Sequence, residues 1–139
     1  MNYISGMQAL NLPCELDTCG DWHRSGMDWD RPFLLESNDS VFGDYGIEHD
    51  KSIPGNSGLF SVANHIRACL DLIERSHFAL AQGMNQDFFC NDQYDEEVFS
   101  KVLLLKTKNN WPLVDDFMTQ EYRLRWLSFK EDLYGSNES

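Results

Sequence analysis

The pattern of hydrophobic and polar positions changes part-way along the chain. Residues 1–57 carry apolar residues only in short clusters, separated by Gly, Pro, Asp, Asn and Ser. That texture is typical of short strands and packed loops. The apolar runs at 33–35 and 41–42 flank the turn-forming sequence 37–40 and predict a hairpin. A linker rich in Gly, Pro, Asn and Ser, residues 53–58, closes this half.

From Phe60 onward the hydrophobic positions recur at spacings of three and four, which predicts a helix that ends before Gly83. The polar positions Asn64, Arg67 and Asp71 lie mainly on the other side of that helix. The apolar stripe comprises Val62, His65, Ile66, Cys69, Leu72, Ile73 and Ser76.

Two further helix starts follow. Either Asn91 or Asp92 can cap a second helix, and the carboxylates at 95–97 suit the positive end of its dipole. The sequence Asn-Trp-Pro at 110–112 predicts a third start, because proline is tolerated in the first turn. A break near 119–120 divides the apolar pattern that follows, so three or four helices are expected.

These patterns predict a single domain of the α+β class, and 139 residues is a usual length for one domain. An irregular or β-containing N-terminal half (1–57) is expected to pack on three or four C-terminal helices (58–134). The helical half should supply most of the core, with Phe99 buried in it. Residues 135–139 are expected to form a frayed tail.

The composition indicates what kind of protein the chain is and in which compartment it is expected. The chain is 42% hydrophobic and 13% aromatic, which is typical of a globular protein and not of a disordered one. No apolar run approaches the ~18 residues needed to cross a bilayer, and the N-terminus lacks the pattern of a signal peptide. A cytoplasmic protein without membrane contact is therefore predicted. In that compartment the four cysteines are expected as reduced thiols and not as disulfides.

The formal net charge of −12 narrows the choice of partners. Residues 1–60 hold ten acids against three bases, and residues 61–139 hold thirteen acids against eight bases. So acidic a chain repels phosphates, which argues against direct binding of nucleic acid. A basic protein partner is favoured, because complementary charge accelerates encounter. Acidity that serves only solubility is the competing interpretation.

Several residues could serve chemistry. Cys14, Cys19 and His23, completed by His49 or Cys69, are ligand types that zinc accepts. Their spacing lacks the paired C-x2-C knuckles of structural zinc sites, and free cysteines are usually small buried hydrophobes. No cofactor is therefore predicted, and structural zinc is the open alternative.

A thiol nucleophile is the second chemical possibility. Cys19 and His23 stand at i and i+4 and would meet on a helix, but Gly20 and Gly26 argue against a helix there. His49 forms a His-Asp pair of the kind that metal phosphohydrolases use. These residues define an alternative function, a small metal-dependent or thiol enzyme centred on Cys19, His23 and His49.

Carboxylates alternate with large rings in three short stretches of the N-terminal half. Either the rings are core and the acids merely solvated, or the rings are interface anchors and the acids select a cationic partner. The second interpretation predicts a partner-binding surface made of Asp21, Trp22, Asp28, Trp29, Asp30, Asp44 and Tyr45.

A resemblance covers most of the chain, through residues 3–6, 9–13, 20–23, 42–48, 64–67, 81–84 and 121–126. In these stretches, which include Gly-Asp-Trp-His and Phe-Gly-Asp-Tyr-Gly-Ile-Glu, the chain resembles a family of small bacterial proteins of mobile-element and defence loci, found near nucleotidyltransferase-like toxins. The resemblance implies an antitoxin or inhibitor role and assigns no catalytic residue. The expected function is a non-enzymatic acidic protein that inhibits a basic nucleic-acid-handling enzyme or toxin, as antitoxins and anti-CRISPR proteins do, by mimicking nucleic-acid charge.

Overall fold

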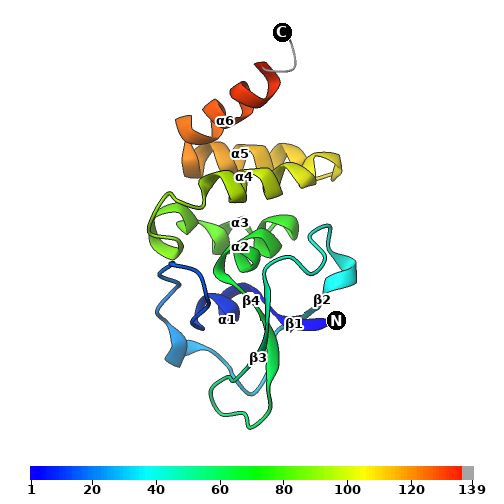
Figure 1. The fold of residues 1–139 in the computed structure, drawn as a ribbon, viewed down its shortest axis with the longest axis vertical. Helices are drawn as coiled ribbons and strands as arrows, with labels where there is room; N and C mark the ends of the chain where they lie inside the picture. The colour runs from blue at the N-terminus through cyan, green and yellow to red at the C-terminus, as the bar shows by residue number, and fades with distance from the viewer. Residues whose placement is uncertain (136–139) are drawn as a thin grey trace.

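The chain folds as an α+β protein, as predicted, with its strands in the N-terminal half and most of its helices in the C-terminal half (Figure 1). The structure, a computed structural model, describes residues 1–135. Of the tail predicted at 135–139, Gly135 ends the last helix, and residues 136–139 lie outside the described residues.

Four short strands form one sheet: β1 (Asn2–Ile4), β2 (Leu34–Glu36), β3 (Ile47–Lys51) and β4 (Phe60–Ala63), in the order β2-β1-β4-β3. β1 runs parallel to β4 and antiparallel to β2, and β3 pairs with β4 in an antiparallel ladder. The predicted hairpin between 33–35 and 41–42 is therefore wrong. Its first run pairs with β1, where Tyr3 lies opposite Leu35, and residues 37–39 form a 3-10 turn.

The helix predicted from Phe60 is wrong at its start, because residues 60–63 form β4. The helix α2 (His65–Glu74) begins after Asn64, whose side chain accepts a hydrogen bond of 2.8 Å from the backbone N–H of Arg67. Figure 1 shows α2 between the sheet and the C-terminal helices. Because both sides are covered, the polar positions are buried as well, and Arg67 and Asp71 are 0% and 2% exposed.

Two short elements precede the sheet's later strands, α1 (Gly6–Leu10) and the 3-10 turn η1 (Arg24–Gly26). After α2 come α3 (Phe78–Ala81), the π-turn η3 (Met84–Phe88), α4 (Asp95–Val102), the 3-10 turn η4 (Leu103–Thr107), α5 (Trp111–Tyr122) and α6 (Leu124–Gly135).

The predicted start of α5 at Asn-Trp-Pro is confirmed. The cap predicted at Asn91 or Asp92 is wrong, because α4 begins at Asp95, and the Asn91 amide donates instead to the Asp17 carbonyl. The break after α5 falls at Arg123, which adopts a φ of 53°, and not at 119–120.

Most of the buried hydrophobic residues lie in the helical half, as expected. Phe99 of α4 is 2% exposed and lies within 4.8–5.4 Å, between ring centroids, of Tyr122, Trp126 and Phe129. These rings join α4 to α5 and α6. None of the helices in residues 1–135 is long and apolar enough to cross a membrane.

Candidate functional site

A disulfide joins Cys19 to Cys90, 71 residues apart in the chain. The expectation of four reduced thiols is therefore wrong. The segment after α1 is brought to the end of η3 by backbone hydrogen bonds, because the N–H groups of Cys19 and Gly20 both donate to the carbonyl of Phe88 at 2.9 Å. A contact between such distant segments leaves no mark in the local sequence pattern. Cys14 and Cys69 remain free thiols.

Trp22 projects from this segment and is 81% exposed. Its backbone lies in the left-handed region, with a φ of 65°, which is uncommon and costly for a bulky residue. Both neighbours are held in place: the N–H of Asp21 donates to the Leu10 carbonyl at 2.9 Å, and the N–H of His23 donates to Asn11 Oδ1 at 2.5 Å. The backbone of residues 21–23, the Trp22 frame, is thus held in place, while the Trp22 side chain is exposed to solvent.

The turn before Trp22 requires glycine. Gly20 adopts a φ of +76°, and a Cβ at that position would lie 2.5 Å from the carbonyl oxygen of Leu10. Trp22 lines two hollows. One, of about 360 Å³, is lined by residues that include Cys14, Thr18 and His65, and the other, of about 400 Å³, lies beside the Cys19–Cys90 disulfide.

The second predicted stretch of rings and acids behaves differently. Trp29 is half-buried against the core, and its indole N–H donates to the Arg24 carbonyl at 2.8 Å. Asp28 and Asp30 are exposed, and Asp28 lies 3.8 Å from the Arg31 guanidinium. In this stretch the ring is structural and the acids are solvated.

The third stretch contains Asp44, which is exposed, and Tyr45, whose ring packs against the core. The Tyr45 hydroxyl donates to the Glu97 carboxylate, and the Lys101 ammonium lies 4.3 Å from the ring centroid. Burial, and then the Glu97 carboxylate, raise the pKa of this hydroxyl. The Tyr45 ring is therefore engaged within the protein.

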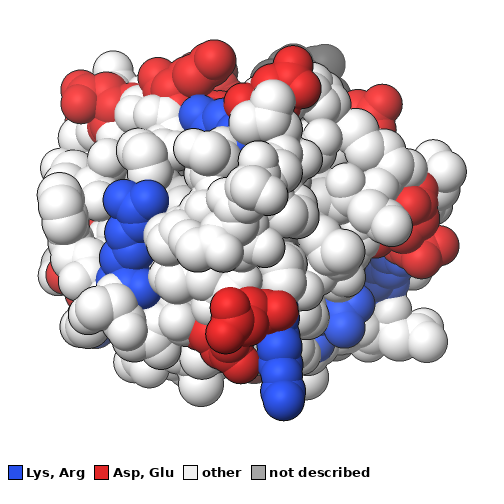
Figure 2. Space-filling model, turned by 90° about the horizontal axis from the view of Figure 1, so that it is seen from below, with Lys and Arg blue, Asp and Glu red and all other residues white. Residues whose placement is uncertain are grey.

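Among residues 1–135, no hydrogen bond, ion pair or ring contact joins the three predicted stretches to one another. Figure 2 shows the face seen from below, on which most of the surface is uncharged, the carboxylates stand in separate groups, and Lys and Arg side chains lie among them. The residues of the predicted surface are therefore not joined into one unit by contacts among themselves.

Cys14, Thr18 and His65 form a chain of polar contacts between the first hollow and the buried start of α2. The Cys14 Sγ lies 3.5 Å from Thr18 Oγ1, which lies 2.6 Å from His65 Nδ1. Burial opposes ionisation of the Cys14 thiol, but His65 and Thr18 outweigh it, and the pKa of the thiol is lowered. Burial likewise opposes the charged form of His65, but the neighbouring Cys14 outweighs it and raises the pKa of the imidazole.

The residues predicted as zinc ligands or as a thiol centre do not assemble as predicted, although Cys14 and Cys19 line one hollow and Cys19 and His23 line the other. The Cys19 sulfur is bonded to Cys90 and is no free thiol. His23 lies 3.1 Å from the Asp21 carboxylate, and the exposed His49 contacts the Ser61 hydroxyl at 3.0 Å. No group of three His, Cys, Asp or Glu side chains that could hold a metal ion is present in the described part of the chain. The centre predicted on Cys19, His23 and His49 is therefore wrong, and the histidine beside a free thiol is His65.

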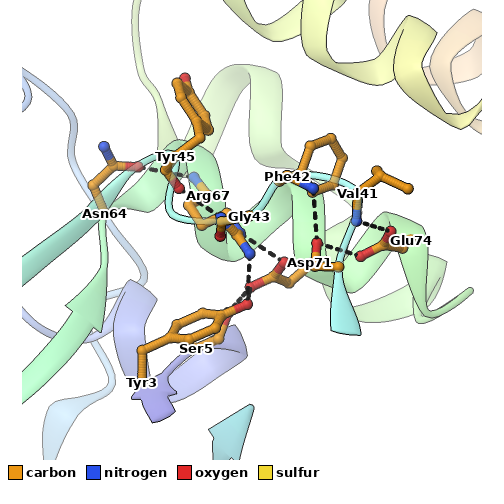
Figure 3. Close-up of polar contacts among 11 residues, drawn as sticks. Tyr3, Ser5, Val41, Phe42, Gly43, Tyr45, Asn64, Arg67, Asp71 and Glu74 are labelled. Carbon is orange, nitrogen blue, oxygen red and sulfur yellow. Dashed lines mark hydrogen bonds and ion pairs between the residues drawn. The ribbon is translucent and has the colours of Figure 1, made fainter. Parts of the chain in front are cut away.

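A buried ionic network centred on α2 was not predicted from the sequence pattern (Figure 3). Arg67 Nε donates to Asp71 Oδ1 at 2.9 Å, and the hydroxyls of Tyr3 and Ser5 donate to Asp71 Oδ2 at 2.7 and 2.6 Å. Arg67 Nη2 in turn donates to the Tyr3 hydroxyl at 2.9 Å. Burial, and then the Asp71 carboxylate, raise the pKa of the Tyr3 hydroxyl.

The same network holds the loop that carries Asp44. Arg67 Nη1 donates to the carbonyls of Gly43 and Tyr45 at 2.6 and 2.7 Å, and Glu74 accepts from residues 40 and 41 at 2.7 and 3.2 Å. Because every charged group has partners, the network is a structural clamp. It fixes the position of the third predicted stretch without leaving a group free for chemistry.

No protein-family model matches the chain, and neither a curated protein nor a solved structure matches it significantly. The resemblance to proteins of mobile-element and defence loci therefore stays a prediction. The geometry around Trp22 is what bears on function.

Proposed function

We propose that the chain is a non-enzymatic interaction protein that binds and inhibits a basic nucleic-acid-handling enzyme or toxin, as an antitoxin or an anti-CRISPR protein does. Its solvated carboxylates would occupy places that nucleic-acid phosphates take in the partner. The observation that carries the proposal is Trp22, which is 81% exposed on a backbone held on both sides.

An exposed tryptophan on a fixed frame is suited to anchor a partner. Tryptophan is enriched among the few interface residues that supply most of the binding energy. Its ring buries a large apolar area on association, and a frame that is already ordered loses little further conformational freedom. The two hollows that Trp22 lines give a partner's side chains places to enter.

Charge supplies the selectivity in this proposal. The net charge of −12 and the exposed Asp28, Asp30 and Asp44 would accelerate encounter with a cationic surface and reject acidic proteins. Trp29 and Tyr45, which pack against the core, are supports of that surface and not anchors.

The test is capture of partners from the source cells, with the parent chain, Trp22→Ala and Leu124→Ala as baits. Leu124 is a matched control, because it is an apolar side chain 75% exposed on α6. We expect a basic nucleic-acid-handling protein that the parent and Leu124→Ala retain and Trp22→Ala loses, and whose activity on nucleic acid the parent inhibits. Equal retention by Trp22→Ala, or a captured partner whose activity is unchanged, would contradict the proposal.

A cytoplasmic location stays a prediction, and the Cys19–Cys90 disulfide argues against a permanently reducing compartment. Disulfides in cytosolic proteins are rare and are mostly transient or redox-sensing. Alkylation of thiols in intact source cells, followed by mass spectrometry, measures the state of this pair. A reduced pair fits the cytoplasm, whereas a fully oxidised pair places the protein elsewhere.

A further inference from the structure

The order of donors in the Cys14–Thr18–His65 chain follows from its far end. His65 Nε2 lies 2.7 Å from the Leu12 carbonyl, which can only accept, so Nε2 carries the hydrogen of a neutral imidazole. Nδ1 is then an acceptor, and it accepts from the Thr18 hydroxyl at 2.6 Å. The oxygen of that hydroxyl is left to accept from the Cys14 S–H at 3.5 Å. The thiol and hydroxyl donors therefore point from the sulfur toward the histidine, and the histidine in turn donates to the Leu12 carbonyl.

We propose that Cys14 is a reactive thiol that forms a mixed disulfide with small-molecule disulfides entering the hollow beside Trp22, with His65 as the base that acts through Thr18. The proposal is independent of the binding function, because it needs neither a protein partner nor the Trp22 ring.

The reaction balances without any further reagent. The Cys14 proton passes to Thr18 Oγ1 as the Thr18 proton passes to His65 Nδ1, which leaves a thiolate and an imidazolium. The thiolate attacks one sulfur of the small disulfide, so a Cys14 sulfur–sulfur bond forms and the original one breaks. The leaving thiolate takes the proton back from His65 through Thr18. Cys14 is oxidised, and one half of the small disulfide is reduced to a thiol.

The surroundings favour this chemistry. Cys14 is half-buried and lines the hollow of about 360 Å³, with Arg24 as a cation on the same wall. The lowered pKa of Cys14 raises its thiolate fraction, and the thiolate is the attacking species. The Glu48 carboxylate on β3 adds to the raised pKa of His65. Cys19, whose sulfur is bonded to Cys90, is partly exposed and lines the same hollow.

The second free thiol supplies an internal control. Cys69 on α2 is fully buried, and burial raises its pKa well above the ordinary value. It should therefore resist the reagents that modify Cys14.

The test is the rate of reaction with oxidised glutathione across pH, read by intact mass and by peptide mapping, which follows Cys14 and the control Cys69 separately. We expect one glutathione to be added to Cys14. As pH is raised, the rate of this addition should begin to increase at a lower pH in the folded chain than in the same chain unfolded in urea. Thr18→Val keeps the shape of the side chain but removes the hydroxyl. In the folded chain at neutral pH it should lower the rate of glutathione addition by roughly tenfold or more, because less thiolate is present. The difference should vanish above the ordinary thiol pKa of about 8.5, and Thr18→Ser should restore the rate.

Three results would overturn the assignment. The first is the absence of a Cys14 adduct, and the second is a pH profile shared by the folded and unfolded chains, a comparison that needs no Thr18 variant to fold. The third is a Cys14–Cys19 cross-link in place of the glutathione adduct. It would show that Cys14 exchanges with the Cys19–Cys90 disulfide and is not a site for small-molecule disulfides.

Discussion

Arg67 is fully buried although it is charged, whereas Trp22 is 81% exposed although it is the chain's largest kind of apolar side chain. Arg67 donates hydrogen bonds to Asp71, Tyr3 and two loop carbonyls, and these bonds offset the cost of burying its charge. At Trp22 the N–H groups of both neighbouring residues are hydrogen-bonded, and the ring itself is exposed to solvent.

The difference separates stability from function in this molecule. A buried ion pair with all its partners present specifies how the sheet, α2 and the loop at 40–46 fit together, and it offers nothing to a ligand. An exposed ring, carried by a backbone with an unfavourable φ of 65°, contributes little to the stability of the fold and is available to a partner. Removing Arg67 should therefore destabilise the fold, and removing Trp22 should leave the fold intact and weaken binding of the proposed partner.

The largest expected effect is that of Arg67→Met. It leaves the Asp71 carboxylate buried without its cation, which costs about 3–5 kcal/mol of unfolding free energy. Arg125→Met is the matched control, because it breaks the exposed pair with Asp95 and should cost less than about 1 kcal/mol. Urea denaturation at neutral pH measures both. Similar losses in the two variants would show that the buried network is no clamp.

Loss of the disulfide should have the next largest effect. Replacing Cys19 and Cys90 together with serine frees a loop spanned by 71 residues and should lower stability by about 2–4 kcal/mol. Cys14→Ser leaves that bond intact and should change stability much less. The measurement is the guanidinium midpoint with and without reductant. A parent midpoint that does not move on reduction would mean that the Trp22 frame does not depend on this bond.

The smallest expected effect concerns charge. Reversal of Asp28 and Asp30 to lysine should slow association with the captured partner by up to roughly tenfold at low salt, because exposed charges act through long-range steering. The same reversal at Asp116 and Asp132, which are exposed on α5 and α6, is the control and should have less effect. Surface plasmon resonance gives the on-rates. A larger loss in the control pair would place the partner on the helical half.

Local sequence signals sufficed for part of the fold. The start of α5 could be predicted because Asn-Trp-Pro acts within one turn, and the burial of Phe99 because α4 repeats its apolar positions. The strand β4 was missed because its four residues merge into the apolar stripe of α2. Short strands whose partners are far away have no periodicity of their own.

The site was harder to predict for the same reason. The burial of Arg67 and Asp71 could not be predicted, because their partners, Tyr3 and the loop at 43–45, lie over twenty residues away. The Cys19–Cys90 pairing spans 71 residues and was hidden for the same reason. Trp22 and Trp29 both follow an aspartate, yet one is exposed and the other half-buried. Only the contacts of the folded chain distinguish them.

The most direct measurement of the central claim is oxidative footprinting of the four tryptophans with the captured partner bound and absent. In the free protein Trp22 should be oxidised fastest, because it is 81% exposed, and the fully buried Trp126 slowest. On binding, Trp22 should become protected while Trp29, Trp111 and Trp126 keep their rates. If Trp22 is oxidised as fast in the complex as in the free protein, it is not the anchor, and the proposed binding face is wrong.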